Sequence, residues 1–194
     1  MKNYNPTINF VIEIDKLKSV FRQSLILDAS RRESVAEHSW HLAMAVILLE
    51  TYSNFNKMDM AKAIKMALVH DIVEIDAGDT YAYDPEANKD KLDRELKAAE
   101  RIYGILPDTQ QDELKNIWKE FEARESPEAK YVDAVDRFIP ILINYLTEGR
   151  QWKLHKVSSQ MVLTRNSPIE EGSSYLWNIV NEIVSDSVKK GYLF

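Results

Sequence analysis

The 194-residue sequence contains no cysteine and only five glycines. The absence of cysteine excludes disulfide bonds, thiolate nucleophiles, iron–sulfur clusters and cysteine-ligated zinc. Any metal ion bound by the chain must therefore be held by histidine and carboxylate side chains, which suits a labile catalytic ion better than a structural zinc. The sequence also lacks a run of about 20 apolar residues that could cross a bilayer, and its start does not resemble a signal peptide. These absences predict a soluble, cytoplasmic protein.

Positively charged residues are in the minority. The sequence has 25 Lys and Arg residues against 31 Asp and Glu residues, which gives a formal net charge of -6. Nucleic-acid polymers and anionic membranes are bound by clustered Lys and Arg, so we expect neither as a partner. A small anionic ligand remains compatible with this balance, because a metal ion and an arginine can reverse the field locally. The length and the 45% hydrophobic content fit one globular domain.

Apolar residues recur at the i, i+3, i+4 and i+7 spacing of amphipathic helices, and sustained period-two alternation is missing. All five glycines fall where this periodicity stops, which is where glycine commonly ends a helix. The pattern predicts an all-α fold with about seven helices in a single compact domain over residues 1–194. We place the helices at about 8–25, 34–52, 59–75, 88–104, 108–123, 127–147 and 173–190.

Three of the expected helices begin with recognisable N-cap signals. Ser34 followed by Glu37 matches the capping-box pattern. Asp59 can cap the third helix. Ser126 followed by Pro127 is an N-cap with proline at the first helical position. These signals predict where three of the helices start.

Potential metal ligands lie in the same three helices. His38 is in the second helix. His70 and Asp71 interrupt an apolar run of the third helix, and Asp136 lies in the sixth. An imidazole or a carboxylate buried in a hydrophobic helix costs several kcal/mol unless it is paired. A divalent metal ion is one suitable partner, because it binds imidazole nitrogen and carboxylate oxygen.

Each of these polar residues also has a structural interpretation. A histidine on an apolar face, such as His41 three residues after His38, is more often a hydrogen-bonded core residue than a ligand. Asp133 has Arg137 at i+4 and is interpreted as its salt-bridge partner. Asp136 has no basic residue at that spacing, which favours it as an inward-facing ligand. Spacing alone leaves both a metal site and a set of structural polar residues open.

The order of these residues, with their neighbours, resembles a known family. Residues 31–38 (RRESVAEH) are similar to the first motif of the 5'-deoxynucleotidase group within the HD-domain metal-dependent phosphohydrolase superfamily. Residues 67–74 (ALVHDIVE), followed by Gly78 and Asp79, resemble its second motif. Residues 128–136 (EAKYVDAVD) resemble its final ligand helix.

The resemblance covers about residues 8–150 and leaves 151–194 as a C-terminal helical extension. It implies a helical HD domain and a metal-dependent phosphomonoesterase that hydrolyses (deoxy)nucleoside 5'-monophosphates to nucleoside and phosphate. It also implies one divalent ion (Mn, Co, Zn, Fe or Mg). In this pattern the ligands of the ion are His38, His70, Asp71 and Asp136. His41 is not among them, and we assign it to packing or to support of the site.

Further roles follow from the resemblance. Glu74 would position or deprotonate the attacking water, and Asp79 would contact the sugar or the leaving oxygen. Arg22 matches an arginine that contacts the phosphate or sugar, and Arg31 would contact the substrate or hold its loop; either arginine can instead be a solvated surface residue. Gln23 stands where bacterial members have a tryptophan that favours deoxyribose. That departure leaves the choice between deoxyribose and ribose open.

Two other functions fit the same residues. One keeps the fold and the metal but changes the substrate to a cyclic nucleotide, an alarmone or a nucleoside triphosphate. The other is a helical binding module that senses a nucleotide with little turnover, although the retained ligands and Glu74 speak against it. The long, partly apolar last helix also predicts a homodimer. His155 and the weakly periodic segment 151–172 receive no functional assignment.

Overall fold

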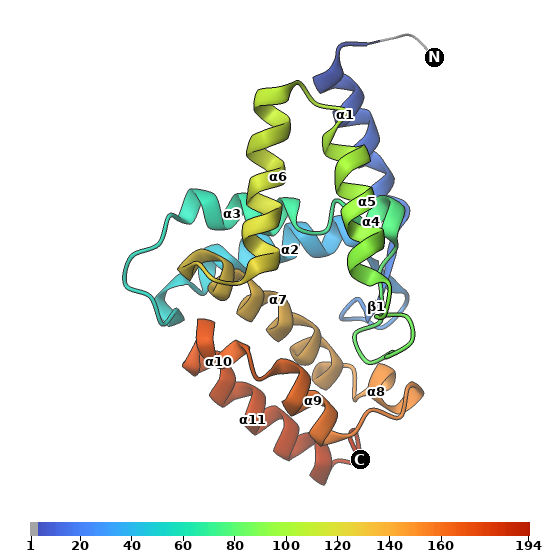
Figure 1. Cartoon of the computed structure of the whole chain (residues 1–194). Coiled ribbons are helices and arrows are strands. Elements are labelled where there is room, and N and C mark those ends of the chain that lie inside the picture. The colour runs from blue at the N-terminus through green and yellow to red at the C-terminus, as the bar shows by residue number, and fades with distance from the viewer. Residues whose placement is uncertain (1–3) are drawn as a thin grey trace.

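The computed structural model describes residues 4–194, which form a helical molecule with one short β-hairpin (Figure 1). Helices α1 to α7 span Pro6–Ile14, Val35–Leu48, Met60–Val69, Glu74–Ala77, Lys91–Tyr103, Asp108–Ala123 and Pro127–Leu146. Helices α8 to α11 span Arg150–Leu154, Ser159–Asn166, Ile169–Gly172 and Ser174–Lys189. The all-α class is confirmed. Over the described residues, none of these helices has the length and apolar character needed to cross a membrane.

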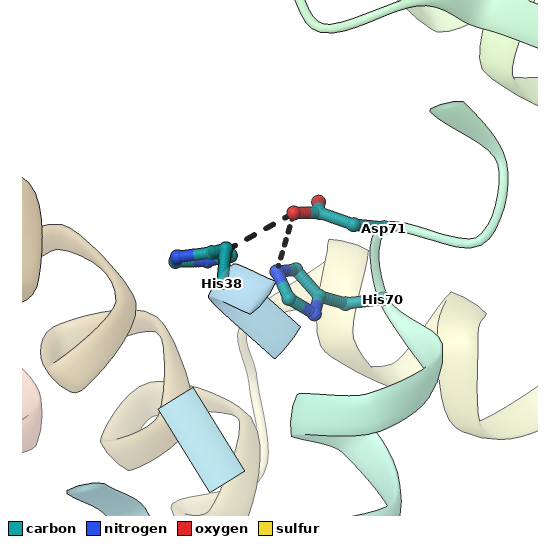
Figure 2. A group of neighbouring side chains, drawn as sticks. All are labelled: His38, His70 and Asp71. Carbon is teal, nitrogen blue, oxygen red and sulfur yellow. Dashed lines mark ion pairs between the residues drawn. The ribbon is translucent and has the colours of Figure 1, made fainter. Parts of the chain in front are cut away.

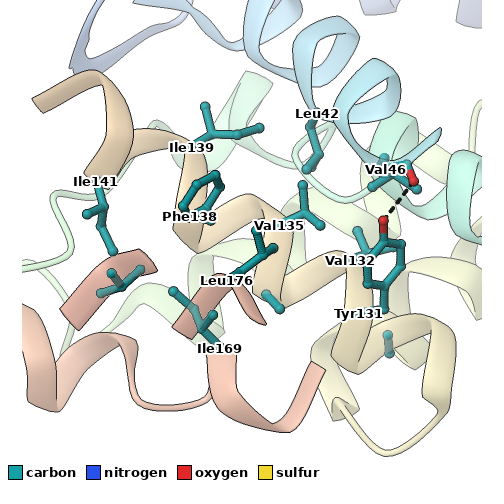
Figure 3. Packing of buried hydrophobic residues seen from close by; sticks show 14 of the residues in the cluster. Leu42, Val46, Tyr131, Val132, Val135, Phe138, Ile139, Ile141, Ile169 and Leu176 are labelled. Atoms are coloured by element: carbon teal, nitrogen blue, oxygen red, sulfur yellow. Dashed lines mark hydrogen bonds between the residues drawn. The ribbon is translucent and has the colours of Figure 1, made fainter. Parts of the chain in front are cut away.

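Helix α7 is the centre of the molecule. In Figure 1 it crosses the middle, with α5 and α6 on one side and α9 to α11 on the other. Its residue Val135 belongs to one hydrophobic cluster with Leu42 of α2 and Leu176 of α11 (Figure 3). The hydroxyl group of Tyr131, also on α7, donates a hydrogen bond of 2.8 Å to the Val46 carbonyl of α2. Because α7 is packed on both sides, a side chain in its middle has a fixed position.

The predicted N-caps are confirmed. The Ser34 hydroxyl accepts a hydrogen bond from the Glu37 N–H, and the Glu37 carboxylate accepts one from the Ser34 N–H, which completes a capping box at the start of α2. Asp59 and Ser126 accept hydrogen bonds from N–H groups in the first turns of α3 and α7. The starts of α2, α3 and α7 are therefore fixed by local sequence.

The expected first helix at about 8–25 is wrong beyond Ile14. A short 3-10 helix (Asp15–Ser19) follows, and then strand β1 (Phe21–Leu25) pairs antiparallel with β2 (Arg32–Ser34). The backbone hydrogen bonds of this segment go to the partner strand instead of along a helix. Helical spacing of apolar residues could not reveal this competing long-range pairing.

The third helix also ends earlier than the predicted range of about 59–75. It stops at Val69, whose carbonyl oxygen accepts a hydrogen bond of 3.1 Å from the buried Tyr103 hydroxyl of α5. The same oxygen also accepts a hydrogen bond of 3.1 Å from the Ile72 N–H at i+3 spacing, so the chain leaves α3 in tighter turns. A short turn leads into α4, so Glu74 is not one turn beyond His70 on a continuous helix, as the sequence had predicted.

The segment after α7 folds back against it, through more helices than the periodicity predicted. Gly172, at the end of α10, lies so close to α7 that a Cβ atom there would sit 2.2 Å from the Lys130 carbonyl oxygen and 2.6 Å from the Ala134 Cβ atom. The missing side chain therefore allows the two backbones to touch.

We expect Gly172→Ala to destabilise the fold by about 1–3 kcal/mol, because the added methyl group overpacks the contact between α10 and α7. Thermal unfolding followed by circular dichroism would show a lower melting temperature. Ser174→Ala, at an exposed neighbouring position, is the control and should melt like the wild type. Wild-type stability of Gly172→Ala would contradict the close packing of the two helices.

Candidate metal centre and catalytic site

Three parts of the chain bring the four predicted ligands together. His38 is one turn into α2 and fully buried. His70 and Asp71 follow the last residue of α3, at the point where that helix breaks. Asp136 lies in the middle of α7. Three local features thus bring these side chains together. They are the capping box of α2, the break after α3 and the packing of α7.

The donor atoms of these residues surround one point. His38 Nε2 lies 2.8 Å from Asp136 Oδ1, and His70 Nε2 lies 3.1 Å from Asp71 Oδ2. The distances from His38 Nε2 to Asp71 Oδ2 and from His70 Nε2 to Asp136 Oδ1 are both 3.9 Å. Figure 2 shows Asp71 reaching toward both imidazole rings. Two nitrogen atoms and two oxygen atoms therefore converge from separate elements.

The chemistry of these atoms fits a divalent ion. His70 Nδ1 lies 3.1 Å from the Ala67 carbonyl oxygen, and donation to that oxygen leaves the lone pair on Nε2. His70 Nε2 is buried and makes no hydrogen bond within residues 4–194. A buried lone pair without a donor is well suited to a metal ion. An ion that takes six ligands would keep positions for water and a phosphate oxygen beside four protein ligands.

Arg22 of β1 supplies the positive charge beside these residues. Its Nη1 atom donates a hydrogen bond of 2.8 Å to Asp71 Oδ2, and its Nη2 atom lies 4.0 Å from Asp136 Oδ1. Burial alone would lower the pKa of Arg22, but the Asp71 and Asp136 carboxylates raise it above its ordinary value. Arg22 therefore remains charged and compensates two buried carboxylates. The alternative of a solvated surface residue does not hold for Arg22, whose side chain is only 14% exposed.

The protonation states of the four candidate ligands follow from the same charges. Burial alone would raise the pKa of Asp71, but His70 and Arg22 hold it far below its usual range. Burial is likewise outweighed at Asp136, where the hydrogen bond with His38 lowers the pKa most. Burial lowers the pKa of His38, whereas at His70 the Asp71 carboxylate outweighs burial and raises the pKa. Both carboxylates are ionised at neutral pH, as metal binding requires.

Glu74 and Asp79 lie next to this cluster, and their pKa values are raised where those of Asp71 and Asp136 are lowered. Glu74 is 5% exposed, and its Oε2 atom has no hydrogen-bond partner within the described chain. Burial raises the pKa of Glu74 well above its ordinary value, and the Asp71 and Asp79 carboxylates raise it further. Burial also raises the pKa of Asp79, although Arg22 and a backbone hydrogen bond from Gln23 oppose the shift. Carboxyl groups with raised pKa values are suited to proton transfer.

Arg31 lies outside the cluster. It is exposed and forms a two-pronged ion pair with Glu37, at 2.8 and 2.6 Å, and donates a further hydrogen bond to the Arg32 carbonyl. These contacts favour the predicted role of holding the loop over the predicted contact with substrate. His41 makes no hydrogen bond or ion pair among residues 4–194, in line with its assignment to packing.

A cavity of about 130 Å³ opens beside the candidate ligands. Arg22, Asp79 and Asp136 form part of its wall. The remaining wall is polar and aromatic and includes Gln23, Tyr81, Tyr83, Asn144, Gln151, Trp152 and Asn166. The cavity therefore joins the charged cluster to a chamber that can receive a small organic group.

Sequence reasoning missed several residues of this site. Glu33 of β2 is 9% exposed, and its Oε2 atom lies 3.7 Å from His38 Nδ1. Burial raises the pKa of Glu33 to about 7, although Arg22 acts in the opposite direction. Glu33 is part of the first motif, but nothing in the motif indicates that it is buried. Gln151 and Trp152 fall in the weakly periodic segment, where no sequence signal marked them.

Comparison with known proteins agrees with this geometry. The family model for the HD domain matches residues 14–177. A protein of Danio rerio named 5'-deoxynucleotidase HDDC2 is 31% identical over 158 residues, which are 81% of this chain and 77% of that protein. The Homo sapiens protein of the same name is 29% identical over 136 residues, which are 70% of this chain and 65% of that protein.

The solved structures include a similar one from Magnetospirillum magnetotacticum MS-1, named as a "Predicted metal-dependent phosphohydrolase". It has 45% sequence identity and a TM-score of 0.92, and the match covers 97% of this chain and 94% of that one. The likeness therefore includes the helices after α7. Together with the family match, these findings show that the chain belongs to the HD-domain superfamily of metal-dependent phosphohydrolases.

Proposed function

We propose that this protein is a phosphomonoesterase that adds water to deoxynucleoside 5'-monophosphates and releases nucleoside and inorganic phosphate. The observation that carries the proposal is the convergence of two histidines and two aspartates beside the buried Arg22 at the wall of a cavity. The relatives named 5'-deoxynucleotidase support the choice of substrate class.

The superfamily implies a divalent metal ion, and we propose His38, His70, Asp71 and Asp136 as its four ligands. When bound, such an ion lowers the pKa of a water molecule toward neutrality and neutralises charge on the phosphate. Mn, Co, Zn, Fe and Mg are all candidates, since a site of imidazoles and carboxylates binds several divalent ions.

The protein residues supply the remaining chemistry. Arg22 binds the phosphate, because its rigid donor fork matches phosphate oxygens and its charge persists at every physiological pH. Glu74 orients the attacking water and accepts its proton, a role that the free Oε2 atom and the raised pKa support. Asp79, in the cavity wall, contacts the sugar or gives a proton to the leaving oxygen.

We place the nucleoside in the cavity that begins at these groups. Tyr81, Tyr83 and Trp152 give it aromatic surface, and Asn144 and Gln151 give it amide groups. A mixed wall of this kind is typical of small-molecule sites. The extension after α7 therefore contributes to substrate binding, and we propose that it forms a single domain with the rest of the chain.

We also propose a homodimer with no nucleic-acid or membrane partner. The apolar face of α11, on which the prediction of a dimer was based, is used within the chain, since Leu176 and Val180 are buried. An exposed apolar stripe runs instead along α2, with residues spaced four, three and one apart. It consists of Trp40, Met44, Ile47 and Leu48, which are 66, 38, 44 and 70% exposed. The predicted cytoplasmic location stays a prediction.

The substrate class is tested by phosphate release from deoxynucleoside 5'-monophosphates, a cyclic nucleotide, a nucleoside triphosphate and a non-nucleotide phosphomonoester, with added Mn²⁺, Co²⁺ or Mg²⁺. We expect the deoxynucleoside monophosphates to give the highest kcat/KM. In the same assay Glu74→Gln should lose at least about 100-fold in kcat, because it removes the proton acceptor. Preference for any other ester, or undiminished turnover by Glu74→Gln, would contradict the proposal.

Arg22→Met should separate phosphate binding from metal binding. We expect kcat/KM to fall about 10- to 100-fold, since a hydrogen bond between charged groups is lost. The affinity for Mn²⁺, measured by isothermal titration calorimetry, should be retained or raised, because the competing cation beside Asp71 and Asp136 is gone. A variant with wild-type kcat/KM would rule out the phosphate contact.

The dimer is tested by light scattering at micromolar concentration. The wild type should show twice the chain mass of 22.5 kDa, and Trp40→Glu should shift it to the monomer because a charge would be buried at the interface. Leu154→Glu is the matched control, since Leu154 is 68% exposed but lies outside the α2 stripe. A monomeric wild type would refute the dimer, and a dimeric Trp40→Glu would remove the stripe from its interface.

A further inference from the structure

Two buried nitrogen atoms of the site have no hydrogen-bond partner within residues 4–194. One is Nδ1 of His38, and the other is Nε of Arg22. The first belongs to a candidate metal ligand and the second to the arginine proposed to bind phosphate. Leaving a buried polar atom without a partner is costly, so two such atoms near one carboxylate require an explanation.

The same carboxylate oxygen faces both nitrogen atoms. Glu33 Oε2 lies 3.7 Å from His38 Nδ1 and 4.0 Å from Arg22 Nε. Both separations are just beyond hydrogen-bond length, so a small inward shift of the Glu33 side chain would close them. Glu33 is in β2, directly before the capping residue Ser34, so its backbone is held by both the hairpin and the start of α2.

Glu33 differs from the structural carboxylates of this fold. Its side chain makes no hydrogen bond to any described residue, and it is only 9% exposed. Glu128, which is 8% exposed, accepts a hydrogen bond from the Asp59 N–H and pairs with Lys62. Glu128 joins two helices, whereas the only charged groups within 4.0 Å of the Glu33 carboxylate among the described residues are those of the site.

We infer that Glu33 is a positioning residue that orients His38 for the metal ion and Arg22 for the substrate phosphate. The role of Glu33 toward Arg22 rests on the proposed function. Its role toward His38 rests on the divalent ion that the superfamily implies. With Nε2 of His38 directed at the metal, its proton is on Nδ1 and needs an acceptor, which Glu33 provides. The same oxygen would anchor Arg22 Nε, and this holds the two Nη atoms on the side of Asp71 and Asp136, where the phosphate is proposed to bind.

The metal part is tested by titrating Mn²⁺ alone into the metal-free full-length protein and measuring Kd by calorimetry. Glu33→Ala removes the acceptor, and we expect Mn²⁺ affinity to fall about 10- to 100-fold, the usual effect of losing such a partner. Glu33→Gln retains an acceptor oxygen and should recover part of the loss. Glu128→Gln is the matched buried control, which should bind Mn²⁺ like the wild type.

Circular dichroism melting accompanies each titration. If Glu33→Ala does not fold, the near-isosteric Glu33→Gln decides the question, because it should still bind Mn²⁺ several-fold more weakly than the wild type. Wild-type Mn²⁺ affinity in every folded Glu33 variant would overturn the inference. An equal loss in Glu128→Gln would also overturn it, since the effect would then follow stability and not the contact with His38.

The phosphate part is tested by kinetics at saturating Mn²⁺. Glu33→Ala should raise KM for a deoxynucleoside monophosphate more than it lowers kcat, because Arg22 would lose its anchor. An unchanged KM would overturn the role toward Arg22. If the wild type binds Mn²⁺ but hydrolyses none of the esters, the proposed function fails, whereas the role of Glu33 toward His38 is still decided by the Mn²⁺ affinities.

Discussion

The structure depends on the balance of charge around one buried cluster. Two ionised carboxylates, Asp71 and Asp136, lie among buried imidazoles, and the only cation within 4.0 Å of them among the described residues, apart from those imidazoles, is Arg22. Separating buried carboxylates from water costs several kcal/mol each, so such a group persists only with a compensating positive charge. Arg22 provides part of that charge, and a divalent ion would provide the rest.

The fold is arranged to hold this cluster from several directions. The hairpin presents Arg22 and Glu33 from the N-terminal side, and the capping box sets the turn of α2 that carries His38. The break after α3, secured by the Tyr103 hydroxyl, turns His70 and Asp71 toward the same point. Since each side chain comes from an element packed on its own part of the core, the candidate ligands are held close together without an ion, which would reduce the conformational cost of binding one.

The sequence predicted which polar side chains come together better than it predicted the local backbone. His38, His70, Asp71 and Asp136 stand out because polar groups in apolar helices are conspicuous, and the N-caps are read from single residues. The hairpin was missed because each strand is stabilised by its pairing with the other strand, and the residue pattern within one segment does not reveal that pairing. The break after Val69 was missed because the backbone changes there to i+3 hydrogen bonds, beside the Tyr103 hydroxyl of a distant helix, and the spacing of apolar residues does not reveal this change. Glu33 could not be assigned, since burial of a glutamate depends on tertiary structure.

The central claim is that the four convergent side chains bind one divalent ion in place of their contact with Arg22. The most direct measurement is crystallography of the Mn²⁺-loaded protein with data at the manganese absorption edge. The account predicts a single anomalous peak bound by His38, His70, Asp71 and Asp136, with the Arg22 guanidinium no longer paired with Asp71. A manganese ion bound elsewhere would contradict the account. So would a structure without an ion at this site in which Arg22 is still paired with Asp71.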